Sequence, residues 1–318
     1  MADRFHSPNR PPSLRFNMRT LLLLTIAVGV WLGWLANSAR RQREAVEYVK
    51  AKGGLVRYDH NSSILQTLSQ SNTETPAPEW LVDLLGVDYF SKVEAVLLPS
   101  LGYVSEGRRG RFDPRDELDL RAIAALRDLE QLDLRGRQIK YVTALGEFTD
   151  LVYLQAADVQ VLDASPADFV DQVGQLDKLE ALDLAGTEAS DFSPLEGLSN
   201  LQSLNLSGAT VADLTPLGRM KKLSTLTLDK TNVSDIAPLS RSRTLVGLSL
   251  NKTKVADVAP LAKMQSLTWL SLRGTQVVDV TVLVELQNLG DLRLNPDFSI
   301  DQVQQLQMLM PNCEVSTR

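Results

Sequence analysis

The sequence has very few of the side chains that most often carry out chemistry or bind metals. In 318 residues it contains one cysteine, Cys313, and two histidines, His6 and His60. A single cysteine excludes a disulfide framework and any cysteine cluster for a metal ion, and two histidines leave little for a histidine-based catalytic site. We therefore expect no catalytic residues, no metal site and no cofactor.

The chain also has too little positive charge for a nucleic-acid-binding protein. Its net charge is -6; residues 1–60 hold ten Lys and Arg against four Asp and Glu, a balance of +6, so the remaining residues carry -12. Binding to nucleic acid depends on basic side chains that neutralise phosphates. An acidic body of this kind argues against a nucleic-acid partner.

Only one long uncharged run is present, Thr20–Ala36. Its 17 residues are the lower limit for a membrane-spanning helix, and Trp31 and Trp34 suit a lipid interface. We predict a single-pass anchor preceded by a short basic tail, residues 1–19. Two rival interpretations are a cleaved signal peptide with a cut near Ser38 and a buried helix of a soluble protein.

The flanking charges give conflicting evidence on membrane orientation. Four arginines precede the run, and six lysines and arginines come after it before residue 58. The positive-inside rule therefore leans weakly toward a cytoplasmic body. A single N-terminal anchor more often exports the polypeptide on its C-terminal side, so we leave the side open and favour the extracytoplasmic arrangement.

The most regular feature of the sequence is a leucine every 22 residues, at Leu179, Leu201, Leu223, Leu245, Leu267 and Leu289. A second leucine occurs three residues later in each complete unit, and a third occurs two residues after that. A fixed period of this length is typical of a solenoid. The alternating pair, such as Leu226 and Leu228, predicts a short parallel strand with one face buried, followed by a return segment.

The L-x-x-L-x-L spacing resembles leucine-rich repeat proteins. The D-[LIFV]-x-P-L tail of several units, as in Asp213–Leu217 and Asp235–Leu239, resembles their 22-residue, internalin-like bacterial subtype. The resemblance implies an α/β fold: a solenoid of about eight to nine units, with a curved parallel sheet and short 3-10 or helical returns, preceded by the N-terminal transmembrane helix.

A second resemblance covers residues 15–60, where R-F-N-M-R-T-L-L-L-L is followed by Gly53-Gly54 and Val56-x-Tyr58-Asp59. This stretch is similar to the N-terminus of membrane-anchored planctomycete leucine-rich repeat proteins. It implies no activity. We expect residues 37–59 to form a juxtamembrane helix that stops at Gly53 and a short extended segment. Residues 60–78 are poor in bulky side chains and predict a flexible linker, and residues 79–318 predict the repeat domain with its two caps.

Irregular units are expected near both ends of the solenoid. The first strand is predicted at Val93–Leu98, and a basic loop, Gly102–Asp116, interrupts its unit as a solvated insertion. An insertion before Leu179 predicts a helix at Pro166–Gln175, with Ser165 as its cap.

At the other end, a helix through Val303, Leu306 and Leu309 and a strand at Cys313–Val315 predict a terminal cap. We interpret Cys313 as a buried cap residue rather than a nucleophile.

Two polar columns recur at the repeat period. Aspartates occur at Asp191, Asp213, Asp235, Asp257 and Asp279. We interpret them as caps of short helical turns rather than as a metal-binding column. Threonines at Thr187, Thr231, Thr253 and Thr275 occupy the place where the family usually carries asparagine, and we expect them to bond to the backbone of the turn.

Side chains that flank the inward leucines form columns on the exposed concave sheet. Most are small and polar. Trp269, Arg273, Asp291 and Arg293 predict one patch of aromatic, arginine and acidic groups, the residue types that often anchor interfaces. Tyr153 lies five strands away. The alternative interpretation of Trp269 is an isolated surface aromatic.

These features together predict a non-catalytic, membrane-anchored binding protein whose partner is another protein. A structural component of the cell envelope without a specific ligand is the stronger alternative. An enzyme is the weaker one, because the nearest candidates, Cys313 and the aspartate column, have structural explanations.

Overall fold

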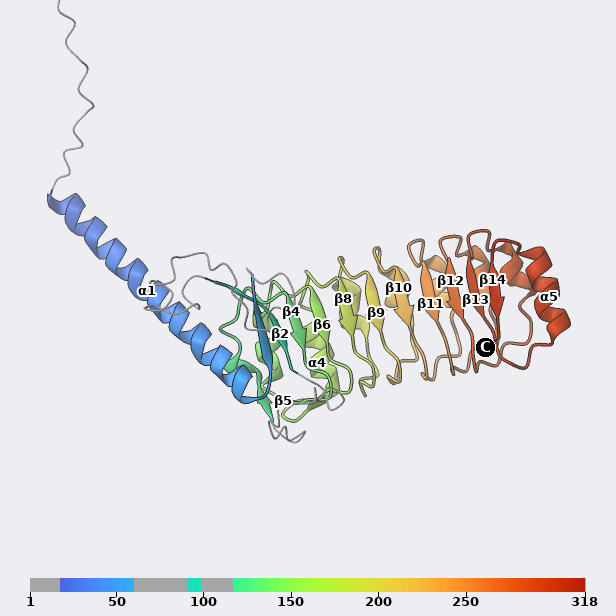
Figure 1. Ribbon diagram of the computed structural model, residues 1–318, viewed down its shortest axis with the longest axis horizontal. Coiled ribbons are helices and arrows are strands. Elements are labelled where there is room, and N and C mark those ends of the chain that lie inside the picture. Colours follow the sequence, from blue (N-terminus) through green and yellow to red (C-terminus); the bar gives the residue numbers. More distant parts are fainter. Residues whose placement is uncertain (1–17, 60–90, 99–116, 318) are drawn as a thin grey trace, which may run out of the picture.

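The computed structural model describes residues 18–59, 91–98 and 117–317, which form a long solenoid with a helix projecting from one end (Figure 1). The main sheet has 11 strands, and consecutive repeats place their strands side by side. All neighbouring pairs are parallel except β1 and β2. The strands are β1 (Leu55–Tyr58), β2 (Val93–Leu97), β4 (Gln131–Asp133), β6 (Tyr153–Gln155), β8 (Ala181–Asp183), β9 (Ser203–Asn205), β10 (Thr225–Thr227), β11 (Gly247–Ser249), β12 (Trp269–Ser271), β13 (Asp291–Arg293) and β14 (Glu314–Ser316). The predicted repeat solenoid is confirmed.

The leucine period sets the register of the sheet. Leu226 in β10 pairs with Leu204 in β9 and Leu248 in β11, and all three side chains are buried. Thr225 and Thr227 flank Leu226 on the outer face, where Thr225 is exposed and Thr227 is partly buried. Strand side chains alternate, so the leucines of successive repeats stack into one continuous core.

Short 3-10 turns return the chain from one strand to the next. They are η3 (Val142–Glu147), η4 (Ser193–Gly197), η5 (Leu217–Arg219), η6 (Ala237–Arg241), η7 (Ala259–Lys263) and η8 (Thr281–Glu285), with η2 (Leu120–Ala122) near the N-terminal end.

The aspartate column caps the regular returns. The Asp235 carboxylate accepts a hydrogen bond from the backbone N–H of Ala237 at 2.8 Å, and the other four aspartates make the equivalent bond. The N–H belongs to the first residue of the turn in η4, η6, η7 and η8, so the predicted cap role is confirmed there; Asp213 bonds to Thr215, two residues before η5 begins.

The threonine column lies a few residues after the strands, at the end of the turn that leaves each strand. The hydroxyls of Thr231, Thr253 and Thr275 donate to the backbone oxygen three residues earlier, at 2.6 to 2.7 Å. All three threonines are buried. Each hydroxyl adds a hydrogen bond to the backbone of its turn, as predicted; the oxygens of Leu250 and Leu272 also accept from the backbone N–H of Thr253 and Thr275.

Two longer helices replace the tight return where the sequence breaks its period. Helix α4 (Pro166–Val173) begins with a capping box made by Ser165 and Asp168, and α5 (Ile300–Leu309) begins with one made by Ser299 and Gln302. Helix α5 and strand β14 close the C-terminal end.

Cys313 is 2% exposed beneath this C-terminal cap. Burial, followed by the nearby Asp291 and Glu314, raises the pKa of its thiol to about 11. Cys313 is therefore a buried cap residue, as predicted, and is poorly suited to act as a nucleophile.

Helix α1 (Met18–Ala51) is continuous, so the predicted span and the predicted juxtamembrane helix form a single element. Its N-terminal half is exposed, which excludes the buried-helix interpretation. Its C-terminal half covers the open end of the core through Ala45, Val46 and Val49, which are 1%, 3% and 0% exposed.

Strand β1 comes directly after α1 and pairs antiparallel with β2. The folded repeat unit therefore begins before residue 79, where the sequence had placed its boundary, because the solenoid takes its N-terminal cap from α1 and β1. The predicted linker 60–78 and the predicted loop Gly102–Asp116 lie outside the described residues.

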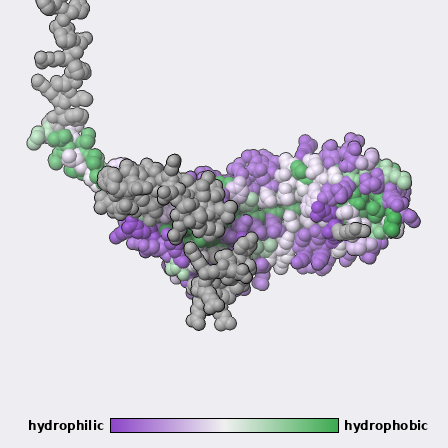
Figure 2. All heavy atoms as spheres, in the orientation of Figure 1, coloured by the Kyte–Doolittle hydropathy of each residue, from purple (hydrophilic) through white to green (hydrophobic). Residues whose placement is uncertain are grey.

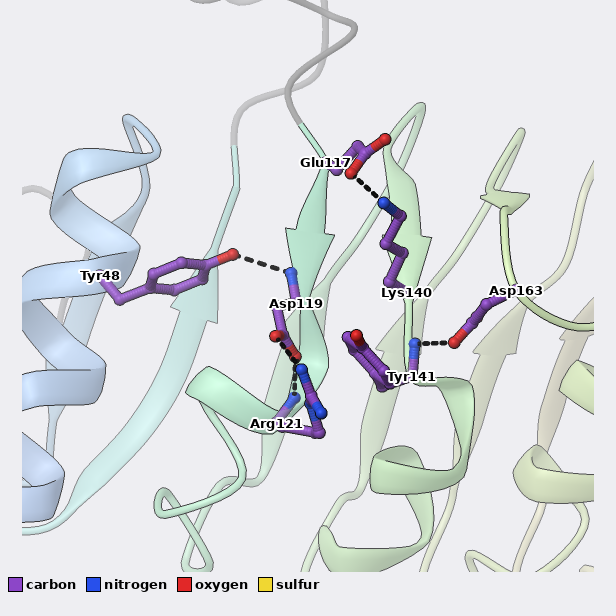
Figure 3. Close-up of polar contacts among 7 residues, drawn as sticks. All are labelled: Tyr48, Glu117, Asp119, Arg121, Lys140, Tyr141 and Asp163. Carbon is purple, nitrogen blue, oxygen red and sulfur yellow. Dashed lines mark hydrogen bonds and ion pairs between the residues drawn. The ribbon is translucent and has the colours of Figure 1, made fainter.

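A second, three-stranded sheet lies beside the first repeats. It is formed by β3 (Leu118–Asp119), β5 (Gln138–Lys140) and β7 (Gln160–Val161). Figure 3 shows how α1 is joined to it: the Tyr48 hydroxyl accepts a hydrogen bond from the backbone N–H of Asp119 at 2.8 Å. Gln42 on α1 also donates to the backbone oxygen of Ser91 at 2.7 Å. The cap is thus held by hydrogen bonds as well as by apolar packing.

Candidate functional site

Three of the predicted patch residues lie together on the concave sheet. Strands β12 and β13 pair Trp269 with Asp291, and Arg293 lies two residues later on β13. The Arg293 guanidinium lies over the Trp269 ring, 5.5 Å from its centre, and forms an ion pair with Asp291 at 2.9 Å. We call Trp269, Asp291 and Arg293 the tryptophan patch.

Glycine on the preceding strand makes room for the indole. A Cβ atom on Gly247 would lie 3.4 Å from a carbon of the Trp269 ring, so the ring rests over this glycine. Trp269 is partly buried as a result. The side chain is held between Gly247 and Arg293 and is not an isolated aromatic projecting into solvent.

Arg273, the fourth residue predicted for the patch, lies on the turn after β12. Its backbone N–H donates to the Asn251 side-chain oxygen at 2.9 Å. Its Nε atom is buried and has no hydrogen-bond partner among the described residues. A buried guanidinium nitrogen without an acceptor is costly unless a ligand supplies one.

Tyr153 stands apart from the other four predicted residues. It is 44% exposed on β6, five strands from Trp269. At about 4.8 Å per strand the separation is about 24 Å. The structure therefore leaves Tyr153 as a separate exposed aromatic on the same face.

A buried polar ladder beside the patch was not foreseen from the sequence. Asp229 accepts from the Ser249 hydroxyl at 2.5 Å and from the Asn251 backbone and side chain at 2.9 and 3.1 Å. Asn251 in turn accepts from the Ser271 hydroxyl at 2.6 Å. Ser249 and Ser271 are only 2% and 1% exposed.

The expectation that the flanking columns form an exposed surface is therefore wrong for this part of the sheet. Small polar side chains in consecutive repeats bond to one another and bury themselves. The recurrence of Asp, Asn and Ser at equivalent repeat positions was the available signal.

Similar polar contacts occur in the N-terminal repeats. Asp183 accepts from the Asn205 side chain at 3.0 Å and from the backbone of Ala185. Burial is the main influence on Asp183 and raises the pKa of its carboxyl. Asp133 is 5% exposed and pairs with Arg135 at 2.7 Å. These contacts give the polar side chains of Asp183 and Asp133 a structural role within the sheet.

A second polar cluster, near the N-terminal end, also has a structural explanation (Figure 3). Asp119 accepts from the backbone and side chain of Arg121, whose guanidinium stacks 3.2 Å from the centre of the Tyr141 ring. Arg121 lowers the pKa of the Asp119 carboxyl through these hydrogen bonds. Lys140 on β5 forms an ion pair with Glu117, the residue before β3. The cluster fastens the edges of β3 and β5.

The described residues contain no group of three or more His, Cys, Asp or Glu arranged to hold a metal ion. The concave face offers recognition chemistry instead: an aromatic ring, a guanidinium and carboxylates on a rigid sheet. Figure 2 shows hydrophilic and hydrophobic residues mixed over the C-terminal repeats in that view.

Stacked parallel strands and short 3-10 returns, with aspartates bonded to the backbone before them, define the molecule as a leucine-rich repeat solenoid. Internalin C2 of Listeria monocytogenes is similar at 30% sequence identity and a TM-score of 0.51, over 56% of this chain and 76% of that one. The chain belongs to the internalin-like leucine-rich repeat proteins.

A leucine-rich repeat protein of Leptospira interrogans shares the fold at 20% identity and a TM-score of 0.53, over 61% of this chain and 50% of that one. No protein-family model and no curated protein matches the sequence.

Proposed function

We propose that the protein is a non-catalytic, membrane-anchored binding protein that presents the concave side of its sheet to a protein partner. The internalin-like repeat fold suits a scaffold for protein–protein interaction. The observation that carries the proposal is the tryptophan patch. Tryptophan and arginine are the residues that most often supply the binding energy of an interface.

The packing of the patch supports this role. Trp269 rests over Gly247 and under Arg293, so the ring is ordered before a partner arrives. Binding to an ordered side chain avoids the entropy cost of immobilising it. The partial exposure of the ring leaves apolar surface that a partner can bury.

Membrane attachment is assigned to the exposed half of α1. One window of this helix is apolar enough to cross a bilayer and has no part buried in the protein. A helix of 34 residues is about 51 Å long at about 1.5 Å per residue, which exceeds the hydrocarbon thickness of about 30 Å. The excess length continues into the N-terminal cap. We place the repeat domain on the extracytoplasmic side, in keeping with the usual behaviour of a single N-terminal anchor.

Capture of a partner from detergent-solubilised membranes tests the binding site. Trp269→Ala is expected to weaken capture by about tenfold or more, equal to about 1.4 kcal/mol, while the melting temperature stays near that of the wild type. Val278→Ala, at an apolar side chain 82% exposed outside the concave strands, is the control and should leave capture unchanged. Equal capture by both variants would favour a structural role for the protein.

Membrane attachment is tested by fractionation. The full chain should remain in the membrane fraction after high-salt and alkaline washing. A mature N-terminus mapped near Ser38 would show cleavage and contradict the anchor.

A further inference from the structure

Four cations lie on three consecutive turns that come after strands β10, β11 and β12. Lys230, Lys252 and Lys254 are exposed, and Arg273 is partly buried. The turns are in register, because the backbone N–H of Lys230 donates to Asn251 and that of Lys252 donates to Arg273, both at 2.7 Å. Neighbouring strands of these repeats lie side by side in Figure 1, at a spacing of about 4.8 Å. We call these four residues the basic edge.

The four cations of the basic edge outnumber the carboxylate on these three turns, that of Asp229. None of its four side chains forms an ion pair with a residue that the structure describes. The acidic residue on the first of these turns is Asp229, whose carboxylate is already bonded to Ser249 and Asn251. Because the chain as a whole carries a net charge of -6, this local excess of positive charge does not follow from its composition.

Glycine again determines how the side chains lie. A Cβ atom on Gly274, whose φ is +69°, would stand 3.1 Å from the Lys252 Cγ. The stem of Lys252 therefore lies across the next turn, toward the repeat that carries Arg273. The lysine and the arginine are presented on one surface, beside the strand that holds Trp269.

We infer that the partner presents an acidic, extended segment, with an apolar side chain against the tryptophan patch and carboxylates against the basic edge. This inference rests on the proposed function and adds the chemistry of the partner. A guanidinium binds a carboxylate through two parallel hydrogen bonds, and the Arg273 side chain is only partly buried, so part of it remains open to such a contact. The long lysine side chains can reach alternate residues of a strand, which lie about 6.6 Å apart.

Other anionic partners fit the structure less well. The basic edge begins five strands beyond β2, the strand nearest to α1 in the parallel stack, or about 24 Å at the usual strand spacing. Lipid headgroups around the exposed half of α1 would not meet it. A nucleic acid would bring a dense row of phosphates to an otherwise acidic body, which repels it.

Fluorescence anisotropy of a labelled peptide of alternating glutamate and serine tests the inference, with the full chain in neutral detergent. The wild type should bind it in a saturable, salt-sensitive manner and bind the matching glutamine–serine peptide less tightly. The edge variant, Lys230→Gln with Lys252→Gln and Arg273→Gln, should lose about tenfold in affinity, equal to about 1.4 kcal/mol. Two exposed ion pairs and one partly buried pair are together expected to contribute about this much.

A control variant removes the same number of positive charges from the returns that connect these strands. Arg241→Gln, Arg243→Gln and Lys263→Gln change three exposed cations on or beside the 3-10 returns η6 and η7. The control should retain the affinity of the wild type. Equal losses in the two variants, no saturable binding by the wild type, or binding of single-stranded DNA as tight as that of the acidic peptide would overturn the inference.

Failure of the inference can be told apart from failure of the proposed function. If Trp269→Ala abolishes capture of a partner while the edge variant captures it normally, the proposed binding site is supported and the inference of an acidic partner is contradicted. If neither variant changes capture, the proposed binding site itself is contradicted.

Discussion

Alanine at Gly54 tests whether the end of α1 is a packed part of the repeat domain. Gly54 lies in the turn between α1 and β1. A Cβ atom there would stand 2.6 Å from the Val49 Cγ1, 2.7 Å from the Leu98 Cδ2 and 3.0 Å from the Val49 backbone oxygen. Val49 and Leu98 are both 0% exposed, so neither side chain can turn away into solvent.

The size of the effect can be worked out from these distances. Carbon atoms in contact prefer about 3.5 to 4.0 Å, so the side chains of Val49 and Leu98 must each move about 1 Å away from residue 54 to admit the methyl group. Overpacking of this kind costs about 1 to 3 kcal/mol. A domain of this length loses about 2 to 4 °C in melting temperature for each kcal/mol. We expect Gly54→Ala to lower the melting temperature by several degrees.

Two glycines of the same chain provide matched comparisons. Gly33 lies in the exposed half of α1 with nothing within 4 Å of an added Cβ, so Gly33→Ala should not change melting. Gly53 has equal space but a φ of +74°, and alanine there should cost about 1 kcal/mol through backbone strain alone.

Thermal unfolding of the full chain in detergent, monitored by circular dichroism, measures all three variants. Hydrogen exchange should also quicken at the end of α1 in Gly54→Ala. Equal melting of Gly54→Ala and Gly33→Ala would refute the packing of α1 as the N-terminal cap.

Three further predictions concern the repeats. Leu226→Ala should destabilise the protein by about 2 to 5 kcal/mol, whereas Thr227→Ala on the outer face should be near neutral; equal effects in chemical denaturation would contradict the strand register. Asp235→Ala should cost about 1 kcal/mol in the same assay through loss of its cap, and no change would mean that water replaces the carboxylate. Because the pKa of Cys313 is raised to about 11, only about 0.1% of the thiol is ionised at pH 8; it should react with a thiol reagent only after unfolding, and rapid reaction of the native protein would contradict its burial.

The tryptophan patch shows which side-chain neighbours can be predicted from the 22-residue repeat period and which cannot. Repeats of 22 residues place Trp269 and Asp291 on neighbouring strands, and alternation brings Arg293 to the same face. The sequence predicted this proximity. It did not show that the ring rests over Gly247 or that the Nε of Arg273 is buried without an acceptor, because both depend on how side chains of different repeats share the surface.

The solenoid could be predicted from the amino-acid pattern without any coordinates. Each repeat contacts mainly its neighbours, so a local pattern of leucines, aspartates and threonines is enough to specify the strand, the return and the stacking. Two other features required the folded structure: α1 and β1 close the open end of the core, and several outward polar side chains are buried in a ladder. Both depend on contacts between residues far apart in the chain. The sequence alone did not show that Ala45, Val46 and Val49 are core residues, because they become buried only by packing on the end of the solenoid, which includes Leu98.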